Sequence, residues 1–275
     1  MGSDREGSKE CAKSLADRLS SAPEMESAAS DPFETYFAEL RARHLARASL
    51  GDIRKGIQSL SILYVERRAR LGGEDPMEGA AKRAAFALFY APLHFLLVRQ
   101  IVREIGAGQP VPRLIFDLGC GTGAAGAAWA LEAGGAPVEG VDRSSWAVDE
   151  ARWTLSTLGL KGRVRRLDAE RARFPGEGCA ILAAFTVNEL EAATRDRILA
   201  GLLRAAGKGA RILVIEPIAR SVVPWWNAWS DEFSARGGRA DEWRFAVELP
   251  GELEELDRSA GLDHSELTAR SLWIA

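Results

Sequence analysis

Apolar residues in the first third of the chain recur at the three- and four-residue steps of amphipathic helices. The dipeptide Asp31-Pro32 precedes the first stripe and is typical of a helix N-terminus, where proline is tolerated in the first turn. The first stripe consists of Phe33, Tyr36, Phe37, Leu40 and His44. The second consists of Ile53, Ile57, Leu60 and Tyr64. Two helices are therefore expected before the break at Gly72-Gly73.

A third helical segment is expected from about Met77 to Ile105. Its longest apolar run, 84–98, contains Pro92 and His94 and is shorter than the roughly 20 residues that cross a bilayer. We therefore expect a buried helix with a kink and no membrane partner.

From residue 110 onward, short apolar runs alternate with helical stretches. Strands are expected at 114–118, 137–142, 162–167, 179–185 and 211–215, and helices at 124–131, 144–158 and 191–206. Strands separated by helices require right-handed parallel crossovers, so the expected fold class is α/β, with a doubly wound Rossmann-like sheet. Because only helical signals precede the sheet, we expect an N-terminal helical cap on it.

After the fifth strand the pattern becomes irregular. An insertion is expected at 224–238, then a strand at 243–249, a helix at 251–260 and a final strand at 267–274. The sequence leaves open whether the last two strands pair or one strand of the sheet is missing. The expected organisation is a flexible leader at 1–30, the helical cap at 31–108 and the α/β domain at 109–275.

The composition is that of a globular protein, with 47% apolar and 27% charged residues. The net charge of −3 gives no overall attraction to nucleic acid or to anionic membranes. Three cysteines without metal-binding spacing predict no metal site and favour a reducing compartment such as the cytoplasm. The leader lacks the apolar core of a signal peptide.

The segment 116–125 carries the most specific chemistry of the chain. It follows an apolar run and leads into an alanine-rich stretch, which indicates a strand, a glycine loop and a helix. Glycines let the backbone turn sharply and let a ligand approach closely. The new helix points free N–H groups and the positive end of its dipole at the loop, so a nucleotide-like cofactor is expected.

Charge distinguishes between the cofactors that fit such a loop. The residues from Gly121 to Gly126 also satisfy the dinucleotide fingerprint, with Asp142 at the expected distance downstream. However, Asp117 lies at the end of the strand beside the loop, where a carboxylate repels a pyrophosphate and attracts an ammonium. S-adenosylmethionine carries an amino group and a ribose but no phosphate. The sequence Asp117-Leu118-Gly119-Cys120-Gly121-Thr122-Gly123 closely resembles the first motif of the class I S-adenosylmethionine-dependent methyltransferases.

That resemblance implies a set of cofactor contacts. Asp117 would bind the ammonium, Asp142 the ribose hydroxyls, and Asp168 the adenine amino group. The remaining expected cofactor-binding residues are Gly119, Cys120, Gly121, Gly123, Arg143, Ala169, Phe185 and Thr186.

Methyl transfer from a sulfonium is an in-line displacement, which requires orientation of the acceptor and needs a general base only if the acceptor must lose a proton. The candidates for catalytic residues are Glu189, Asn188 and His94, with His44 as a further candidate base. Each also has a structural interpretation. Asn188 and Glu189 suit a helix N-terminus, and both histidines lie on apolar helix faces.

Aromatic residues point to an acceptor pocket for a small aromatic or hydrophobic molecule. The expected substrate-binding residues are Tyr36, Phe37, Tyr90, Trp225, Trp226 and Trp229. An alternative that the sequence leaves open is that these rings pack the cap against the core.

A rival interpretation is an RNA methyltransferase or a ribosome-assembly factor. The motifs at 186–190 and 214–217 bear a looser similarity to the methyltransferase-like assembly factors of the mitochondrial small ribosomal subunit and their bacterial relatives, although this chain lacks their cysteine cluster. An arginine-rich stripe is also suited to phosphate contacts. It consists of Arg41, Arg43, Arg47, Arg54, Lys55, Arg67, Arg68 and Arg70. A third possibility is a scaffold that binds the cofactor without turnover.

Overall fold

The computed structural model describes residues 31–66 and 78–275, and Pro32 is the first residue of the unit that contains the sheet. The expected leader, the side chain of Tyr64 and the stripe members Arg67, Arg68 and Arg70 lie outside the described residues.

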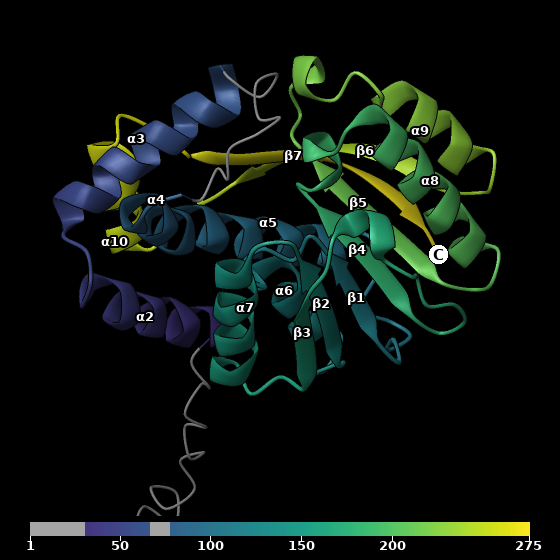
Figure 1. Cartoon of the computed structure of the whole chain (residues 1–275), viewed down its shortest axis with the longest axis horizontal. Coiled ribbons are helices and arrows are strands. Elements are labelled where there is room, and N and C mark those ends of the chain that lie inside the picture. Colours follow the sequence, from purple (N-terminus) through teal and green to yellow (C-terminus); the bar gives the residue numbers. More distant parts are fainter. Residues whose placement is uncertain (1–30, 67–77) are drawn as a thin grey trace, which may run out of the picture. The chain divides into compact units, whose positions relative to one another are not determined.

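A seven-stranded sheet with the order β3-β2-β1-β4-β5-β7-β6 forms the centre of this unit (Figure 1). The strands are β1 (Ile115–Leu118), β2 (Val138–Asp142), β3 (Gly162–Arg166), β4 (Ala180–Ala184), β5 (Arg211–Glu216), β6 (Arg239–Ala246) and β7 (Glu266–Ile274). The first five are parallel, which confirms the expected doubly wound sheet. The question of the last strands is also resolved, because β7 lies antiparallel between β5 and β6, with Trp273 opposite Leu213 and Arg239.

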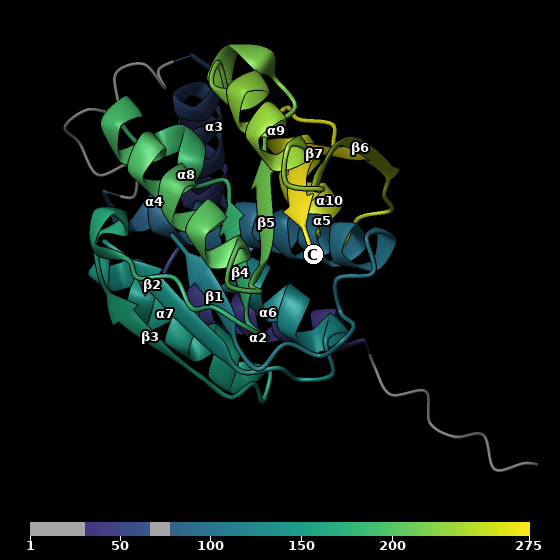
Figure 2. The ribbon, with the colours of Figure 1, turned by 90° about the vertical axis from the view of Figure 1, so that its right-hand side faces the viewer.

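Helices cover both faces of the sheet (Figures 1 and 2). On one face lie α6 (Ala124–Glu132) and α7 (Ser145–Thr157), and on the other lie α8 (Ala192–Ala206) and α9 (Trp226–Ser234). The chain runs outward from β1 to β3 in one direction and from β4 to β5 in the other, so right-handed crossovers place the two helix pairs on opposite faces. Successive residues of β5 point to opposite faces of the sheet. Leu213 and Ile215 belong to the core on one face, and Ile212 and Val214 belong to the core on the other.

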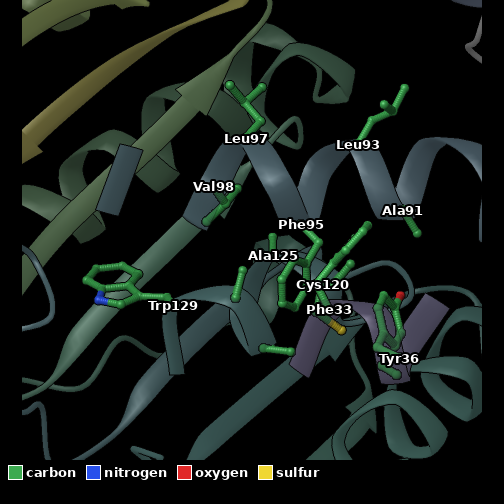
Figure 3. Packing of buried hydrophobic residues seen from close by; sticks show 14 of the residues in the cluster. Phe33, Tyr36, Ala91, Leu93, Phe95, Leu97, Val98, Cys120, Ala125 and Trp129 are labelled. Atoms are coloured by element: carbon green, nitrogen blue, oxygen red, sulfur yellow. The ribbon is translucent and has the colours of Figure 1, made fainter. Parts of the chain in front are cut away.

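The cap consists of α2 (Pro32–Leu45), α3 (Leu50–Glu66) and a long helix formed by α4 (Ala80–Ala85), the π-helical turn η2 (Phe86–Tyr90) and α5 (Ala91–Glu104). It shares a continuous apolar core with α6 and α7. Figure 3 shows Phe33 and Tyr36 of α2 beside Phe95 of α5, with ring centroids 5.3 and 5.6 Å from that of Phe95. These contacts explain the spacing of the first apolar stripe, whose aromatic members are fully buried.

The third expected helical segment forms one continuous helix. It spans 25 residues, Ala80–Glu104, and by length and composition alone it is able to cross a membrane. However, 67% of its most apolar window is buried inside the protein, as in the core helix of a globular domain. Pro92 causes no break because it lies in the first turn of α5. The irregularity lies one turn earlier, in the π-helical turn.

Candidate functional site

A cavity of about 420 Å³ lies at the carboxyl ends of the parallel strands, around the switch between β1 and β4. The strand ends supply one side of it. In spatial order they contribute Asp168 after β3, Asp142 in β2, Asp117 in β1, Phe185 after β4 and Pro217 after β5. The cap supplies Phe86, Tyr90 and His94. The π-helical turn thus brings two aromatic side chains to the site, a position where such turns are frequent.

Asp117 is a buried carboxylate that lacks a cationic partner among the described residues. Its Oδ2 accepts a hydrogen bond of 3.1 Å from the backbone N–H of Gly126 in the first turn of α6. Burial raises the pKa of Asp117 to about 7, the Gly126 hydrogen bond opposes that rise, and the nearby charge of Asp142 adds to it. A ligand cation placed here would be strongly attracted.

The glycine loop is shaped around this carboxylate and around Thr186. Gly119 has φ +65°, and a Cβ there would clash with the Thr186 side chain. The Thr186 hydroxyl lies 3.1 Å from the carbonyl of Leu118 and 3.2 Å from that of Gly119, so it holds the loop against the end of β4. Both Gly119 and Thr186 line the cavity, as do Cys120 and Gly121.

Gly123 is the predicted cofactor residue that lies outside the cavity lining. It has φ +79°, and a Cβ on it would lie 3.0 Å from the Cβ of Ala151 in α7. Its glycine is therefore explained by the left-handed start of α6 and by close helix packing, and not by contact with a ligand.

Asp142 and Asp168 place two further carboxylates on the cavity wall. The Asp142 carboxylate accepts hydrogen bonds from the backbone N–H groups of Gly121 (3.0 Å) and Ser144 (2.8 Å). It therefore fixes both the glycine loop and the start of α7. Asp168 precedes a short 3₁₀ turn, and its side chain makes no capping hydrogen bond to that turn. The Asp168 carboxylate therefore does not cap this turn. Arg143 and Ala169 also line the cavity.

Phe185 has a strained backbone. With φ 56°, it is the one residue other than glycine in the described part of the chain with a positive φ. Its ring stacks on His94 of α5, with centroids 4.2 Å apart and an interplanar angle of 17°. The strained turn after β4 therefore aims an aromatic ring at the cap across the site.

Of the predicted catalytic residues, Glu189 and His94 line the cavity and Asn188 does not. The Asn188 side chain instead donates to the carboxylate of Glu216 at the end of β5, and its backbone N–H donates to the same group at 3.1 Å. This pairing turns Asn188 away from the cavity. His44 also lies elsewhere, because its imidazole bonds to Glu150 of α7 at 3.2 Å in the cap interface.

Most of the predicted acceptor aromatics are in the two cores. Tyr36 and Phe37 are 0% and 2% exposed between cap helices and α7, and they do not line the cavity. Trp225, Trp226 and Trp229 also fall outside it, because α9 packs on the opposite face of the sheet. Tyr90 is the one member of the predicted set that lines the cavity. For the other rings the structure favours the packing alternative.

One pair of cavity residues has no counterpart among the sequence predictions. His264, in the loop between α10 (Gly251–Ser259) and β7, lines the cavity and its Nδ1 is hydrogen-bonded to Asp257. The two residues lie seven positions apart across a helix end, a spacing that matches no familiar motif. The only available signal is that the chain has three histidines, each worth testing as a base.

The lining suits S-adenosylmethionine. Four carboxylates and one guanidinium line the cavity, a balance that favours a cationic ligand over a pyrophosphate; they are Asp117, Asp142, Asp168 and Glu189, with Arg143. A buried carboxylate without a cation fits the ammonium group. Gly121 leaves open space on the cavity wall, because the nearest atom to an added Cβ would be in the Phe86 ring, 3.8 Å away. Among the described residues no cluster of side chains suits a metal ion.

Comparisons with known proteins agree with this geometry. Residues 115–209 match a family described as a methyltransferase domain. A putative O-methyltransferase from Nostoc punctiforme is similar in structure, with a TM-score of 0.50 and 12% identity over 85% of this chain and 72% of that one. At that identity the likeness concerns the fold alone.

Two further structures are similar at lower scores. Mitomycin 7-O-methyltransferase has a TM-score of 0.48 and 15% identity, over 88% of this chain and 72% of its own. Magnesium protoporphyrin IX methyltransferase from Synechocystis, solved with bound S-adenosylmethionine, has a TM-score of 0.44 and 14% identity, over 77% and 93%.

No curated protein matches the sequence. The looser similarity to ribosomal assembly factors stays a prediction. Residues 115–209 thus match a methyltransferase domain, and the sheet order and the glycine loop are those expected for the doubly wound fold of class I S-adenosylmethionine-dependent methyltransferases.

Proposed function

We propose that the protein methylates a small planar or hydrophobic molecule held between the strand ends and the helical cap. The observation that carries this proposal is the composition of one cavity. Acidic side chains lie at the ends of β1, β2 and β3, and aromatic side chains from η2 and the β4 turn lie beyond them. The first group suits the cofactor, and the second suits a flat apolar acceptor.

S-adenosylmethionine, when bound, supplies a methyl group activated by the positive charge on sulfur. The protein's contribution is binding, orientation and exclusion of water. Asp117 would bind the ammonium, Asp142 the ribose hydroxyls and Asp168 the adenine amino group. Phe185 and the cap residues Phe86 and Tyr90 would then hold the acceptor against the methyl group, and such positioning supplies up to roughly 7–11 kcal/mol of the barrier reduction.

The arginine stripe supports a small acceptor rather than RNA. Arg41 pairs with Glu252 at 2.7 Å, and Arg43 pairs with Glu150 at 2.9 Å while its guanidinium lies 5.0 Å from the Trp153 ring. These two cations join α2 to α10 and α7, and phosphate groups would have to compete for them. If RNA were bound through the stripe, its affinity would fall steeply with salt, so a flat salt dependence of RNA binding supports our proposal.

Calorimetric titration with S-adenosylmethionine tests the cofactor assignment. Asp142→Ala should weaken binding at least tenfold. Asp149→Ala is the matched control on α7, because its side chain is 69% exposed and, within the described residues, pairs with Arg152 of the same helix. Equal affinities of the two variants, or tighter binding of NAD than of S-adenosylmethionine by the unaltered protein, would overturn the assignment.

A further inference from the structure

The strand order gives the cavity two ends. Its lining runs from Asp168 beyond β3 to Pro217 after β5 and His264 before β7, and β7 is the neighbour of β5. In the proposed binding mode the adenosine occupies the β2–β3 end and the ammonium lies at β1. The region beyond β4 is then left for the acceptor, and His264 belongs to that end.

His264 is held as one half of a fixed pair. Its Nδ1 is hydrogen-bonded to a carboxylate oxygen of Asp257, and its backbone N–H donates to Asp257 Oδ2 at 2.7 Å. The Asp257 side chain is 6% exposed and that of His264 32%. The chain turns sharply between them, with Gly261 at φ +79° and the N–H of Leu262 donating to the Asp257 carbonyl at 3.0 Å. The imidazole is thus anchored to the end of α10.

The orientation of the His264 ring leaves one of its nitrogens, Nε2, available to accept a proton. With Nδ1 occupied by the carboxylate, Nε2 is the ring nitrogen for which the described part of the chain provides no hydrogen bond. On the cap side, the imidazole makes an edge contact with the ring of Phe89. The ring centroids are 5.5 Å apart and the interplanar angle is 71°. A carboxylate on Nδ1 selects the tautomer whose Nε2 accepts a proton, and it stabilises the imidazolium that results.

Other titratable side chains line the cavity together with His264. Tyr90 from η2 lines the same part of the cavity, and burial raises its pKa to about 12, helped by the negative charge of Asp257 and opposed by a hydrogen bond to Ser61. Tyr90 therefore stays protonated at neutral pH and acts as a donor. Glu189 and His94 also line the cavity, and His94 is stacked face to face on Phe185.

We propose that His264 is the general base for the methyl transfer, that Asp257 positions it, and that the acceptor is an aromatic hydroxyl compound. This inference rests on the proposed function and specifies its substrate class. The acceptor oxygen forms a bond to the methyl carbon while the carbon–sulfur bond breaks, with that electron pair going to sulfur. The hydroxyl proton passes to Nε2 of His264 and later to solvent.

The acidity of the acceptor hydroxyl favours a phenol over an aliphatic alcohol. An imidazole base takes a proton more readily from a phenol, whose pKa is near 10, than from an aliphatic hydroxyl, which is as weakly acidic as water. Aromatic walls formed by Phe86, Tyr90 and Phe185 suit a flat ring.

The test measures transfer of a labelled methyl group from S-adenosylmethionine to phenol, catechol and their 4-nitro derivatives, with benzylamine as an amine probe. At about pH 8.5 the nitro compounds are largely ionised without help, so they need no base. The variants are His264→Asn and Asp257→Asn. The control is His44→Asn, because His44 is also hydrogen-bonded to a buried carboxylate, through Nε2 to Glu150, but lies outside the cavity.

For His264→Asn we expect a fall of about 10²- to 10⁴-fold in kcat on the unsubstituted phenols and less than about threefold on their nitro derivatives. Asp257→Asn should show the same selective loss to a smaller degree, and His44→Asn none. The pH profile of the unaltered protein on phenol should rise through one ionisation that His264→Asn removes. Calorimetric affinity for S-adenosylmethionine should not change in any of the three variants.

Equal losses on the phenols and their nitro derivatives would mean a structural role and would overturn the proposal. So would transfer to benzylamine but to no hydroxyl probe, or no transfer to any probe by protein that binds S-adenosylmethionine. Failure of the unaltered protein to bind S-adenosylmethionine would instead contradict the proposed function itself, so the two failures are distinguishable.

Discussion

The backbone N–H of Gly126 donates to the carboxylate of Asp117 at 3.1 Å, and a Cβ at position 126 would lie 2.5 Å from the same oxygen. The first turn of α6 therefore approaches the end of β1 so closely that only glycine fits. This contact joins the two features of the sequence motif, the acidic strand end and the glycine-rich helix start, and it fixes the carboxylate within the cavity.

Gly126→Ala is expected to displace the Asp117 side chain. Affinity for S-adenosylmethionine should fall at least tenfold, and the free energy of unfolding should fall by about 1–3 kcal/mol because the added methyl overpacks a buried contact. Calorimetry and chemical denaturation measure the two effects. Gly51→Ala in α3 is the control, since the nearest atom to its added Cβ would be 3.7 Å away. Unchanged affinity in Gly126→Ala would show that this contact does not shape the site.

The buried Asp117 should make the free protein less stable as the pH rises. Its folded-state pKa of about 7 exceeds the ordinary value of 3.8, so the folded state retains a proton that the unfolded state loses, and stability falls between about pH 4 and pH 7. The full effect is about 4 kcal/mol. Asp117→Asn should remove it and be more stable than the unaltered protein above pH 7 in urea denaturation. Parallel stability curves of the two proteins from pH 4 to 8 would contradict this prediction.

The same ionisation should control cofactor affinity. Below pH 7 the Asp117 carboxyl becomes neutral, so binding of an ammonium requires loss of a proton and affinity should fall by about tenfold per pH unit. Titrations at pH 7.5 and pH 5.5 measure this fall. Asp117→Asn should bind weakly at both values, and a variant that keeps the full pH dependence would assign it to another group.

Tyr36 should contribute to packing and not to catalysis. Its hydroxyl is buried and has no hydrogen-bond partner within 3.5 Å in the described residues, and the hydroxyls of Thr154 and Thr122 interact with it only weakly. Tyr36→Phe should therefore leave methyl transfer unchanged and raise the free energy of unfolding by about 1 kcal/mol. Tyr90→Phe is the informative comparison, because Tyr90 lines the cavity and its loss should alter the KM of the acceptor. Lost activity in Tyr36→Phe would restore the original acceptor assignment.

Most of the fold follows from local pattern. The apolar runs that become β1 to β5 are short and bounded by turns, so their positions were predictable to within one or two residues. The pairing of β6 and β7 was not, because it depends on contacts between segments far apart in the sequence and on the insertion of β7 beside β5.

The lining of the cavity was predictable where a strand end determines the position of a side chain, as at Asp117, Asp142 and Asp168. The lining was not predictable where the position of a side chain depends on which face of the sheet its helix or loop covers. The aromatic residues from Trp225 to Trp229 are apolar enough for either core, and only the direction of the crossover after β5 places them opposite the cap. Similarly, nothing local indicated that Asn188 turns to Glu216 or that the loop before β7 brings His264 to the cavity.

The most direct test of this account is a crystal structure with bound S-adenosylhomocysteine, the demethylated product. We predict its ammonium within hydrogen-bond distance of Asp117, its ribose hydroxyls on Asp142, and its sulfur directed toward the end of the cavity that contains Phe185 and His264. A ligand bound in the reverse direction, or with its ammonium away from Asp117, would contradict the account.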